Sequence, residues 1–295
     1  MTLKINKGPL SGLRILELGH FVAAPFCTRI LADLGADIIK IESPGKGDPV
    51  RSWGKMVNGK SLWWSVHGRN KKSVTLNLKT PKGLEIAKQL VAQCDGVVEN
   101  FRPGQLERWG LGPDVISEIN SACAVVHISG YGQTGPGRDR AAFGVIGEAI
   151  GGLRHLTGFP EGMTSLPPAR VGISLGDMVA GLYAAIGLMS ALLEHKSIPD
   201  QPTRSADVAL TESVFSLLEG ALPEYGKLGE IRQPTGATLP TSAPSSAYPT
   251  ADERWVLVGA NSDSLFSRLM KLIERPDLDS DDRFADNPGR VKYMD

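Results

Sequence analysis

The sequence predicts an α/β protein built on a parallel β-sheet, and three observations support this. The chain has 295 residues, of which 41% are hydrophobic and 22% charged, so it can bury a sizeable core and form two domains. Short apolar runs alternate with helix-period segments over the first 130 residues, as parallel βαβ units require. A mainly apolar run at 178–193 is typical of a helix buried on all sides.

The expected strands are short apolar runs, and the expected helices follow them. Strands are predicted at 14–18, 37–42, 73–76, 96–99, 124–129, 205–210 and 255–259. Helices are predicted at 25–34, from 80 onward, at 177–193, 211–219 and 264–273, and the whole pattern from 143 to 195 is helical. The helix after residue 80 has the clearest start, because Thr80 suits the N-cap and Pro81 suits the first helical position.

Two domains are expected, with a boundary near residue 224. Residues 1–224 would form a large domain around the parallel sheet, and residues 225–295 a linker and a smaller α+β domain. The segment 233–251 has no charge and four prolines, which predicts a loop. Ligands of a parallel sheet bind beyond the carboxyl ends of its strands, so the site is expected among residues 20–24, 43–51, 100–104 and 130–140.

Charge and cysteine content exclude several classes of protein. Lys plus Arg and Asp plus Glu are 32 each, so the chain lacks the basic excess of a nucleic-acid or membrane-surface binder. The chain starts without an apolar signal-peptide core, and the run at 178–193 is shorter than the ~20 residues of a membrane span. Three cysteines without CxxC spacing predict buried thiols in the cytoplasm, with the mitochondrial matrix as the alternative. No His or Cys pair has metal-ligand spacing, so no metal site is expected.

Two short glycine motifs suggest other chemistries. Residues 130–135 satisfy GxGxxG, but the segment 136–140 predicts a loop where a dinucleotide site needs a helix. Residues 172–176 satisfy GxSxG, which keeps a serine esterase with Ser174 as nucleophile among the alternatives. The only later histidine is His195, and about 30 Å of helix rise would separate it from the serine.

Asp177 follows Gly176 at the start of the long apolar helix. As a structural residue it would be an N-cap that accepts backbone N–H bonds. The same helix end holds a carboxylate ionised and fixes its direction, and Gly176 lets a substrate approach. An ionised, directed carboxylate in an apolar site can act as a covalent nucleophile. Taken alone, the residue leaves both roles open.

Consecutive blocks of the chain resemble the class III CoA-transferases, a family that includes formyl-CoA transferase, carnitine CoA-transferase and α-methylacyl-CoA racemase. In order, the blocks are GLRILELGHFVAAPFCTRILADLGADIIKIESPGKGDPVR, GRNKKSVTLNLKTPKG, DGVVENFRPGQLERWGL, HISGYGQTGP, AFGVIGEAIGGLRHLTG, ISLGDMVAGLYAAIGLMSALLEHK and SADVALTESV. The resemblance covers nearly the full length. It implies a Rossmann-like CoA-binding domain with a smaller domain, in interlocked homodimers.

The resemblance implies transfer of CoA from an acyl-CoA to a carboxylic acid, without a permanently bound cofactor. Asp177 matches the family's catalytic aspartate, which forms an aspartyl-acyl anhydride and then an aspartyl-CoA thioester. The CoA contacts of the family carry over to Phe21, Val22, Ala23, Leu76, Lys79, Asn100, Phe101 and Arg108. A short dicarboxylate is the expected acceptor, because a second carboxylate could be held by Arg51, Arg138, Arg140 or Arg170.

Three alternatives remain open. The racemase branch of the family uses a histidine just after the GYGQTGP block, and the matching position here is Phe143, which favours CoA transfer over racemisation. A serine esterase would use Ser174. Family members continue past the equivalent of Asp295, so an inactive, truncated CoA-binding protein is the third alternative.

Overall fold

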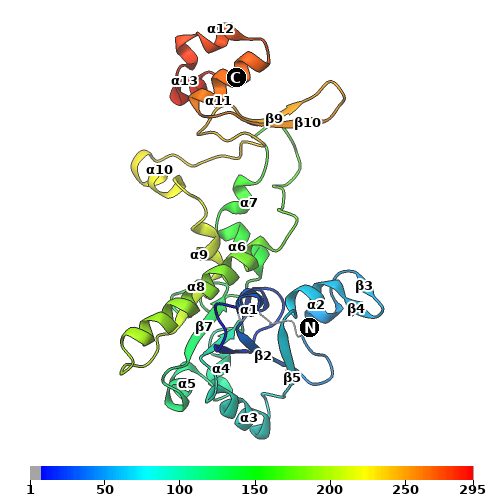
Figure 1. Cartoon of the computed structure of the whole chain (residues 1–295), viewed down its shortest axis with the longest axis vertical. Helices are drawn as coiled ribbons and strands as arrows, with labels where there is room; N and C mark the ends of the chain where they lie inside the picture. Colours follow the sequence, from blue (N-terminus) through cyan, green and yellow to red (C-terminus); the bar gives the residue numbers. More distant parts are fainter. Residues whose placement is uncertain (1–7, 295) are drawn as a thin grey trace, which may run out of the picture. The chain divides into compact units, whose positions relative to one another are not determined.

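The structure, a computed structural model, describes residues 8–294 and contains a six-stranded sheet in the order β5-β2-β1-β6-β7-β8 (Figure 1). The strands are β1 (Arg14–Glu17), β2 (Asp37–Glu42), β5 (Lys71–Thr75), β6 (Gly96–Glu99), β7 (Ala124–Ser129) and β8 (Ala206–Ala209). Every neighbouring pair is parallel. The predicted α/β class with a parallel sheet is therefore confirmed.

Helices cover both faces of this sheet (Figure 1). Ile15 packs with α1 (Ala23–Asp33) and α8 (Leu175–Ser197) on one face. The next residue, Leu16, points to the other face, toward α3 (Pro81–Val91) and α5 (Pro113–Ile119). Because the central strands are buried on both faces, β6 and β7 read as mainly apolar runs rather than as an apolar-polar alternation.

Helix α8 is the run predicted at 177–193, extended at both ends. Length and composition alone would let it cross a membrane, and among residues 8–294 this is true of no other helix. Ala184 and Leu188 are fully buried in the core beside the sheet, whereas Leu182 and Ile186 are 47% and 61% exposed. The prediction of burial on all sides is therefore wrong, because one face of the helix is open.

Contacts divide the described chain into two units, each considered separately below. Residues 8–153 and 171–222 form the first unit, which holds the parallel sheet; residues 154–170 and 223–294 form the second. The second unit contains a hairpin of β9 (Ser245–Pro249) and β10 (Trp255–Gly259). The two-domain division at residue 224 stays a prediction.

Two segments differ from their predicted structure. Strand β9 lies inside the predicted loop 233–251, because its ladder with β10 depends on backbone hydrogen bonds that its polar composition does not reveal. Residues 157–174 contain no helix, although the pattern from 143 to 195 is helical; this stretch is rich in glycine and proline.

The remaining elements are short or lie outside the sheet. They are η1 (Pro49–Ser52), β3 (Met56–Val57), β4 (Lys60–Ser61), α2 (Leu62–His67), α4 (Gln105–Arg108), α6 (Gly144–Ile150), α7 (Leu153–Leu156), α9 (Leu210–Phe215), α10 (Ala221–Leu228), α11 (Asp263–Leu272), α12 (Pro276–Asp279), η2 (Asp282–Phe284) and α13 (Asn287–Lys292). Of these, η1, α4, α6 and α9 flank the site described next.

Candidate active site

A cavity of about 770 Å³ lies at the carboxyl ends of the parallel strands. Its lining includes residues that follow β1, β2, β5, β6 and β7, and parts of all four predicted segments contribute to it. Strands β1 and β6 are neighbours at the centre of the sheet, where the strand order reverses direction. Open α/β sheets bind their ligands at this switch point.

Two backbone turns meet at the switch point and are joined by Asn100. The His20 N–H donates to Asn100 Oδ1 at 2.8 Å, and Asn100 Nδ2 donates to the His20 carbonyl oxygen at 2.8 Å. A Cβ on Gly19 would lie 2.6 Å from Asn100 Oδ1 and 2.3 Å from the Ala24 Cβ, so only glycine fits there. The end of β1 is thereby fixed to the end of β6.

Aromatic rings form one wall of the cavity. The His20 ring lies between the rings of Phe21 and Phe101, at centroid distances of 4.5 and 5.4 Å. Burial lowers the pKa of His20, which keeps its imidazole neutral at pH 7. Phe143, at the mouth of the same cavity, meets Phe21 edge-on at 6.2 Å.

Asp177 lines the same cavity. It is the third residue of α8, and Ser174 occupies the N-cap position, so the interpretation of Asp177 as an N-cap is wrong. Its carboxylate packs against Gly144, the first residue of α6: a Cβ on Gly144 would lie 2.2 Å from Asp177 Oδ2. The first turn of a helix favours a negative charge. The carboxylate is therefore held at a helix start, half-buried, and facing the cavity.

Close contact between α6 and α8 fixes this arrangement. A Cβ on Gly176 would lie 2.8 Å from the Gly144 carbonyl oxygen, so the two helix starts touch through glycines. The Gly176 N–H lies 3.4 Å from Oε1 of Glu148, a carboxyl side chain that is 2% exposed. Neither Gly144 nor Glu148 was predicted from the sequence, because only the folded chain brings α6 to the start of α8.

The cavity carries more positive than negative charge. Its exposed cations are Lys46, Lys79, Arg102 and Arg140. Two of its acidic residues are neutralised by partners, since Asp48 pairs with Lys40 at 2.8 Å and Glu42 with Arg51 at 2.6 Å. Such a surface suits a polyanionic ligand.

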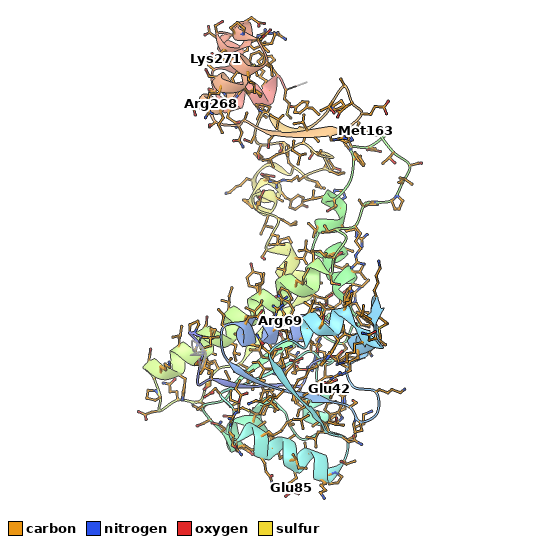
Figure 2. All side chains as sticks on the ribbon, turned by 45° about the vertical axis from the view of Figure 1, so that its right-hand side comes forward. Glu42, Arg69, Glu85, Met163, Arg268 and Lys271 are labelled. Carbon is orange, nitrogen blue, oxygen red and sulfur yellow. The ribbon has the colours of Figure 1, made fainter. Side chains whose placement is uncertain are left out.

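Arg51 is engaged by the protein itself. Its Nε and Nη2 atoms donate to the two carboxylate oxygens of Glu42, at the end of β2 (Figure 2), at 2.6 and 2.7 Å. The guanidinium also stacks over the Trp64 ring at 3.6 Å. Arg138 lies 3.7 Å from Asp139, and Arg170 belongs to the second unit. Of the four arginines considered for a second carboxylate, Arg140 lines the cavity.

Six of the eight predicted CoA contacts line the cavity, namely Phe21, Ala23, Leu76, Lys79, Asn100 and Phe101. The Val22 side chain is buried at the start of α1, and the Arg108 guanidinium donates to Gln105 Oε1 at 2.9 Å; neither residue lines the cavity. The roles of all eight residues stay predictions. Lys46 and Arg102 were missed, although both lie in loops that directly follow predicted strands.

The two glycine motifs occupy different surroundings. A loop follows Gly135, and α6 begins only at Gly144, so the GxGxxG segment lacks the helix that a dinucleotide site needs. Ser174 is not among the residues that line the cavity, and His195 lies near the far end of the same helix. His195 is therefore too far from Ser174 to act as its general base.

The ion pair between Glu42, at the end of β2, and Arg51 is expected to make the stability of the fold depend on pH in the acidic range. Burial opposes the ionisation of Glu42, but hydrogen bonds from Arg51 and Ser73 outweigh it and lower its pKa from 4.5 to about 2. A lowered pKa stabilises the fold above pH 4.5, and this contribution is lost as the pH falls toward 2. Glu42→Gln is expected to cost on the order of 2 kcal/mol of unfolding free energy at pH 7 and less at pH 3.

Urea unfolding at the two pH values measures this difference. The control is Glu85→Gln, which removes an exposed carboxylate on α3 (Figure 2). A stability loss of Glu42→Gln that is equal at pH 7 and pH 3 would contradict the prediction.

A family model described as CoA-transferase family III matches residues 10–295. The chain belongs to CoA-transferase family III. It is 49% identical over 287 residues to succinyl-CoA–D-citramalate CoA-transferase of Chloroflexus aurantiacus, covering 97% of this chain and 70% of that protein. It is 36% identical to human succinyl-CoA:glutarate CoA-transferase, over 97% of this chain and 64% of that protein. It is also 36% identical to acetyl-CoA:oxalate CoA-transferase of Acetobacter aceti, over 98% of this chain and 73% of that protein.

A solved structure shows the same fold. The CAIB/BAIF family protein from Brucella suis superposes with a TM-score of 0.82 and 32% identity, over 98% of this chain and 75% of that one. The family resemblance seen in the sequence is therefore confirmed. As a family III CoA-transferase chain, it spans about two thirds to three quarters of the length of these relatives.

Proposed function

We propose that the chain moves CoA from an acyl-CoA donor to a carboxylic acid acceptor, with Asp177 as the covalent nucleophile. The observation that carries this proposal is the position of the Asp177 carboxylate in a cation-rich cavity at the switch point of the sheet. A volume of about 770 Å³ lies in the range of cofactor-binding sites. The membership in CoA-transferase family III supports the same reaction.

The first half of the proposed reaction converts Asp177 into a thioester. A carboxylate oxygen of Asp177 attacks the acyl carbonyl carbon, the C–S bond breaks, and CoA leaves as a thiolate with the electron pair. The thiolate then attacks the aspartyl carbonyl carbon of the mixed anhydride. The donor acid departs as a carboxylate and an aspartyl-CoA thioester remains.

The second half repeats these steps with the acceptor. The acceptor carboxylate attacks the aspartyl carbonyl carbon and displaces the CoA thiolate, which gives a second mixed anhydride. The thiolate attacks the acceptor carbonyl carbon, so the new acyl-CoA forms and the Asp177 carboxylate is restored. Each step exchanges one bond to carbon for another, and no proton, oxidant or water is consumed.

The cavity residues suggest how CoA is held. Lys46, Lys79 and Arg102 are exposed cations in the loops after β2, β5 and β6, and they would bind the phosphates. Phe21 and Phe101 offer apolar surface for the pantetheine or the adenine. This assignment leaves Arg140 for the second substrate. Arg140 lies in the segment just before Gly144, the residue that contacts the Asp177 carboxylate.

A dicarboxylic acid is the proposed acceptor class. The three enzymes compared above act on citramalate, glutarate and oxalate, all of which are dicarboxylic acids. Arg140 lies in the cavity wall, and its guanidinium sits 5.0 Å from the Tyr131 ring centre, which orients it. A guanidinium is suited to bind the carboxylate that does not react.

An activity assay tests the proposal. Purified protein with succinyl-CoA is expected to form new acyl-CoA with dicarboxylic acceptors at least about tenfold more efficiently than with monocarboxylic acids of equal length. Arg140→Gln is expected to abolish this preference by raising KM for the dicarboxylic acceptor about tenfold or more, while KM for succinyl-CoA changes little. Arg204→Gln, an exposed arginine remote from the cavity lining, is the control. Acceptor preference that survives in Arg140→Gln would exclude this role.

The alternatives within the family make different predictions. Racemisation needs a proton donor or acceptor on each side of the α-carbon. Phe143, which lines the cavity, can supply neither, and this supports transfer. Exchange of the α-proton of a branched acyl-CoA with solvent deuterium would instead support racemase activity.

We also propose a homodimer in the cytoplasm. Half-exposed apolar side chains on α8, including Leu182 and Ile186, offer a surface for a second copy, which analytical ultracentrifugation can test. The buried thiols of Cys27, Cys94 and Cys123 are unpaired, which suits a reducing compartment.

A further inference from the structure

We infer that Lys40 and Asp48 are positioning residues, whose buried ion pair holds the His20–Phe21 turn in the shape that CoA binding requires. This inference rests on the proposed function, because it treats the cavity as the CoA site. The two side chains are each 1% exposed and lie at the edge of the cavity lining, on β2 and in the loop that follows it.

The turn has a backbone conformation that needs support from its surroundings. Phe21 has a φ of 64°, a left-handed value that L side chains rarely adopt. It separates the end of β1 from the start of α1, and both Phe21 and Ala23 line the cavity. A turn of this kind persists when other groups fix its N–H and C=O groups.

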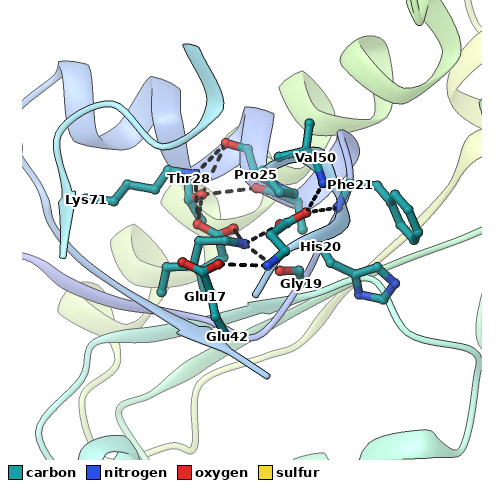
Figure 3. Close-up of polar contacts among 12 residues, drawn as sticks. Glu17, Gly19, His20, Phe21, Pro25, Thr28, Glu42, Val50 and Lys71 are labelled. Carbon is teal, nitrogen blue, oxygen red and sulfur yellow. Dashed lines mark hydrogen bonds and ion pairs between the residues drawn. The ribbon is translucent and has the colours of Figure 1, made fainter. Parts of the chain in front are cut away.

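Two independent anchors fix the turn. On the β6 side, Asn100 bonds to both backbone groups of His20. On the β2 side, the Phe21 N–H donates to Asp48 Oδ1 at 3.2 Å, and Lys40 Nζ donates to the Gly19 carbonyl oxygen at 2.8 Å (Figure 3). The Lys40–Asp48 pair therefore holds the N–H group of the left-handed residue and the carbonyl group two residues before it.

Lys40 joins three separate segments. Its ammonium contacts Glu17 Oε1 on β1 at 2.6 Å, the Gly19 carbonyl oxygen at 2.8 Å and Asp48 Oδ2 at 2.8 Å. The contacts with Glu17 and Gly19 are hydrogen bonds, and the contact with Asp48 is an ion pair. The second Asp48 oxygen accepts from Phe21 and, at 2.9 Å, from the Val50 N–H. The Lys40 side chain is 1% exposed and its ammonium is surrounded by these protein oxygens, so Lys40 acts on the cavity through the turn.

The network is electrically balanced, which explains how four charges can be buried together. Glu17 also pairs with Lys71 at 2.8 Å and accepts from the Thr28 hydroxyl at 2.6 Å (Figure 3). The two carboxylates and two ammonium groups sum to zero charge. Burial opposes every charge, but Lys40 and Lys71 lower the pKa of Glu17, and Glu17 and Asp48 raise the pKa of Lys40. A charge removed singly would leave its partner buried without compensation.

The test is a double variant that removes one positive and one negative charge together, Lys40→Met with Asp48→Asn. Glu17 and Lys71 remain as a neutral pair, so we expect a native circular dichroism spectrum. The Kd for CoA, measured by isothermal titration calorimetry, is expected to rise at least about tenfold, with kcat at saturating substrate within about threefold of the parent. Amide hydrogen exchange of the peptide containing residues 19–22 is expected to accelerate, while exchange in β6 stays slow.

A milder variant and a control complete the experiment. Asp48→Asn alone keeps the hydrogen bond from Lys40 to the Gly19 carbonyl oxygen, which the double variant loses, so it is expected to weaken CoA binding less than the double variant does. It also serves if the double variant fails to fold. Asp33→Asn breaks a surface ion pair with Arg69 in the same unit and is expected to leave Kd unchanged. A Kd within twofold of the parent in the folded double variant would overturn the inference. If the double variant does not fold, the same result in Asp48→Asn would overturn it.

Failure of the proposed function gives a separate result. If the parent protein binds no CoA, the proposed function is wrong. The hydrogen exchange of residues 19–22 then still decides whether Lys40 and Asp48 hold the turn, because that measurement needs no ligand.

Discussion

Asp177→Asn is expected to reduce kcat for CoA transfer by a factor of at least about 10³, with little change in the Kd for CoA. The amide has nearly the shape of the carboxylate but is a poor nucleophile, so the mixed anhydride cannot form. The fold is expected to tolerate the change, because the side chain is half-buried and the amide fits the same space beside Gly144. Steady-state kinetics with succinyl-CoA, together with calorimetric binding of CoA, separates chemistry from binding.

Asp114, in the same unit as Asp177, offers a matched control. Asp114 occupies the first turn of α5, as Asp177 does in α8, but it does not line the cavity. Asp114→Asn is expected to keep full activity. If Asp177→Asn also turned over within a few-fold of the parent rate, the carboxylate would have no covalent role.

Gly144→Ala is expected to lower kcat about 10²-fold, because the added methyl group would displace the Asp177 carboxylate. The new Cβ would lie 2.2 Å from Oδ2 and 2.7 Å from Cγ, distances that no relaxed contact allows. Alanine is the better helix former, so the helix α6 is expected to persist. The loss therefore falls on the position of the nucleophile, and kinetics combined with thermal unfolding distinguishes it from loss of the fold.

Gly226→Ala is the matched control for this substitution. Gly226 lies within α10, and a Cβ there meets nothing within 4 Å. That variant is expected to keep the parent activity and stability. Normal activity of Gly144→Ala would show that the carboxylate works from another position than the one in the structure.

The parallel sheet was predictable because its strands are buried on both faces. The runs 96–99 and 124–129 are mainly apolar, and both match the observed strands β6 and β7. The location of the cavity followed from the same prediction, since ligands bind at the carboxyl ends of parallel strands. Asp177 could be singled out because its position at a helix start is a local feature of the sequence.

Features that depend on contacts between distant segments were not predictable. Gly144 lies 33 residues before Asp177, and their contact arises only when α6 packs on α8. The segment 43–51 was expected at the site, but the sequence did not indicate that the Asp48 carboxylate reaches the Phe21 N–H and the Lys40 ammonium. Arg51 was interpreted as a possible substrate contact, but Glu42 and Trp64 occupy its guanidinium.

Chemical trapping of the enzyme-bound intermediate tests whether Asp177 is the covalent nucleophile. The protein is mixed with succinyl-CoA, quenched with hydroxylamine, digested and sequenced by mass spectrometry. Because hydroxylamine cleaves anhydrides and thioesters, we expect a hydroxamate on the Asp177 side chain that forms only when acyl-CoA is present. An unmodified Asp177 in protein that is turning over, or an acyl group found on Ser174 instead, would contradict it.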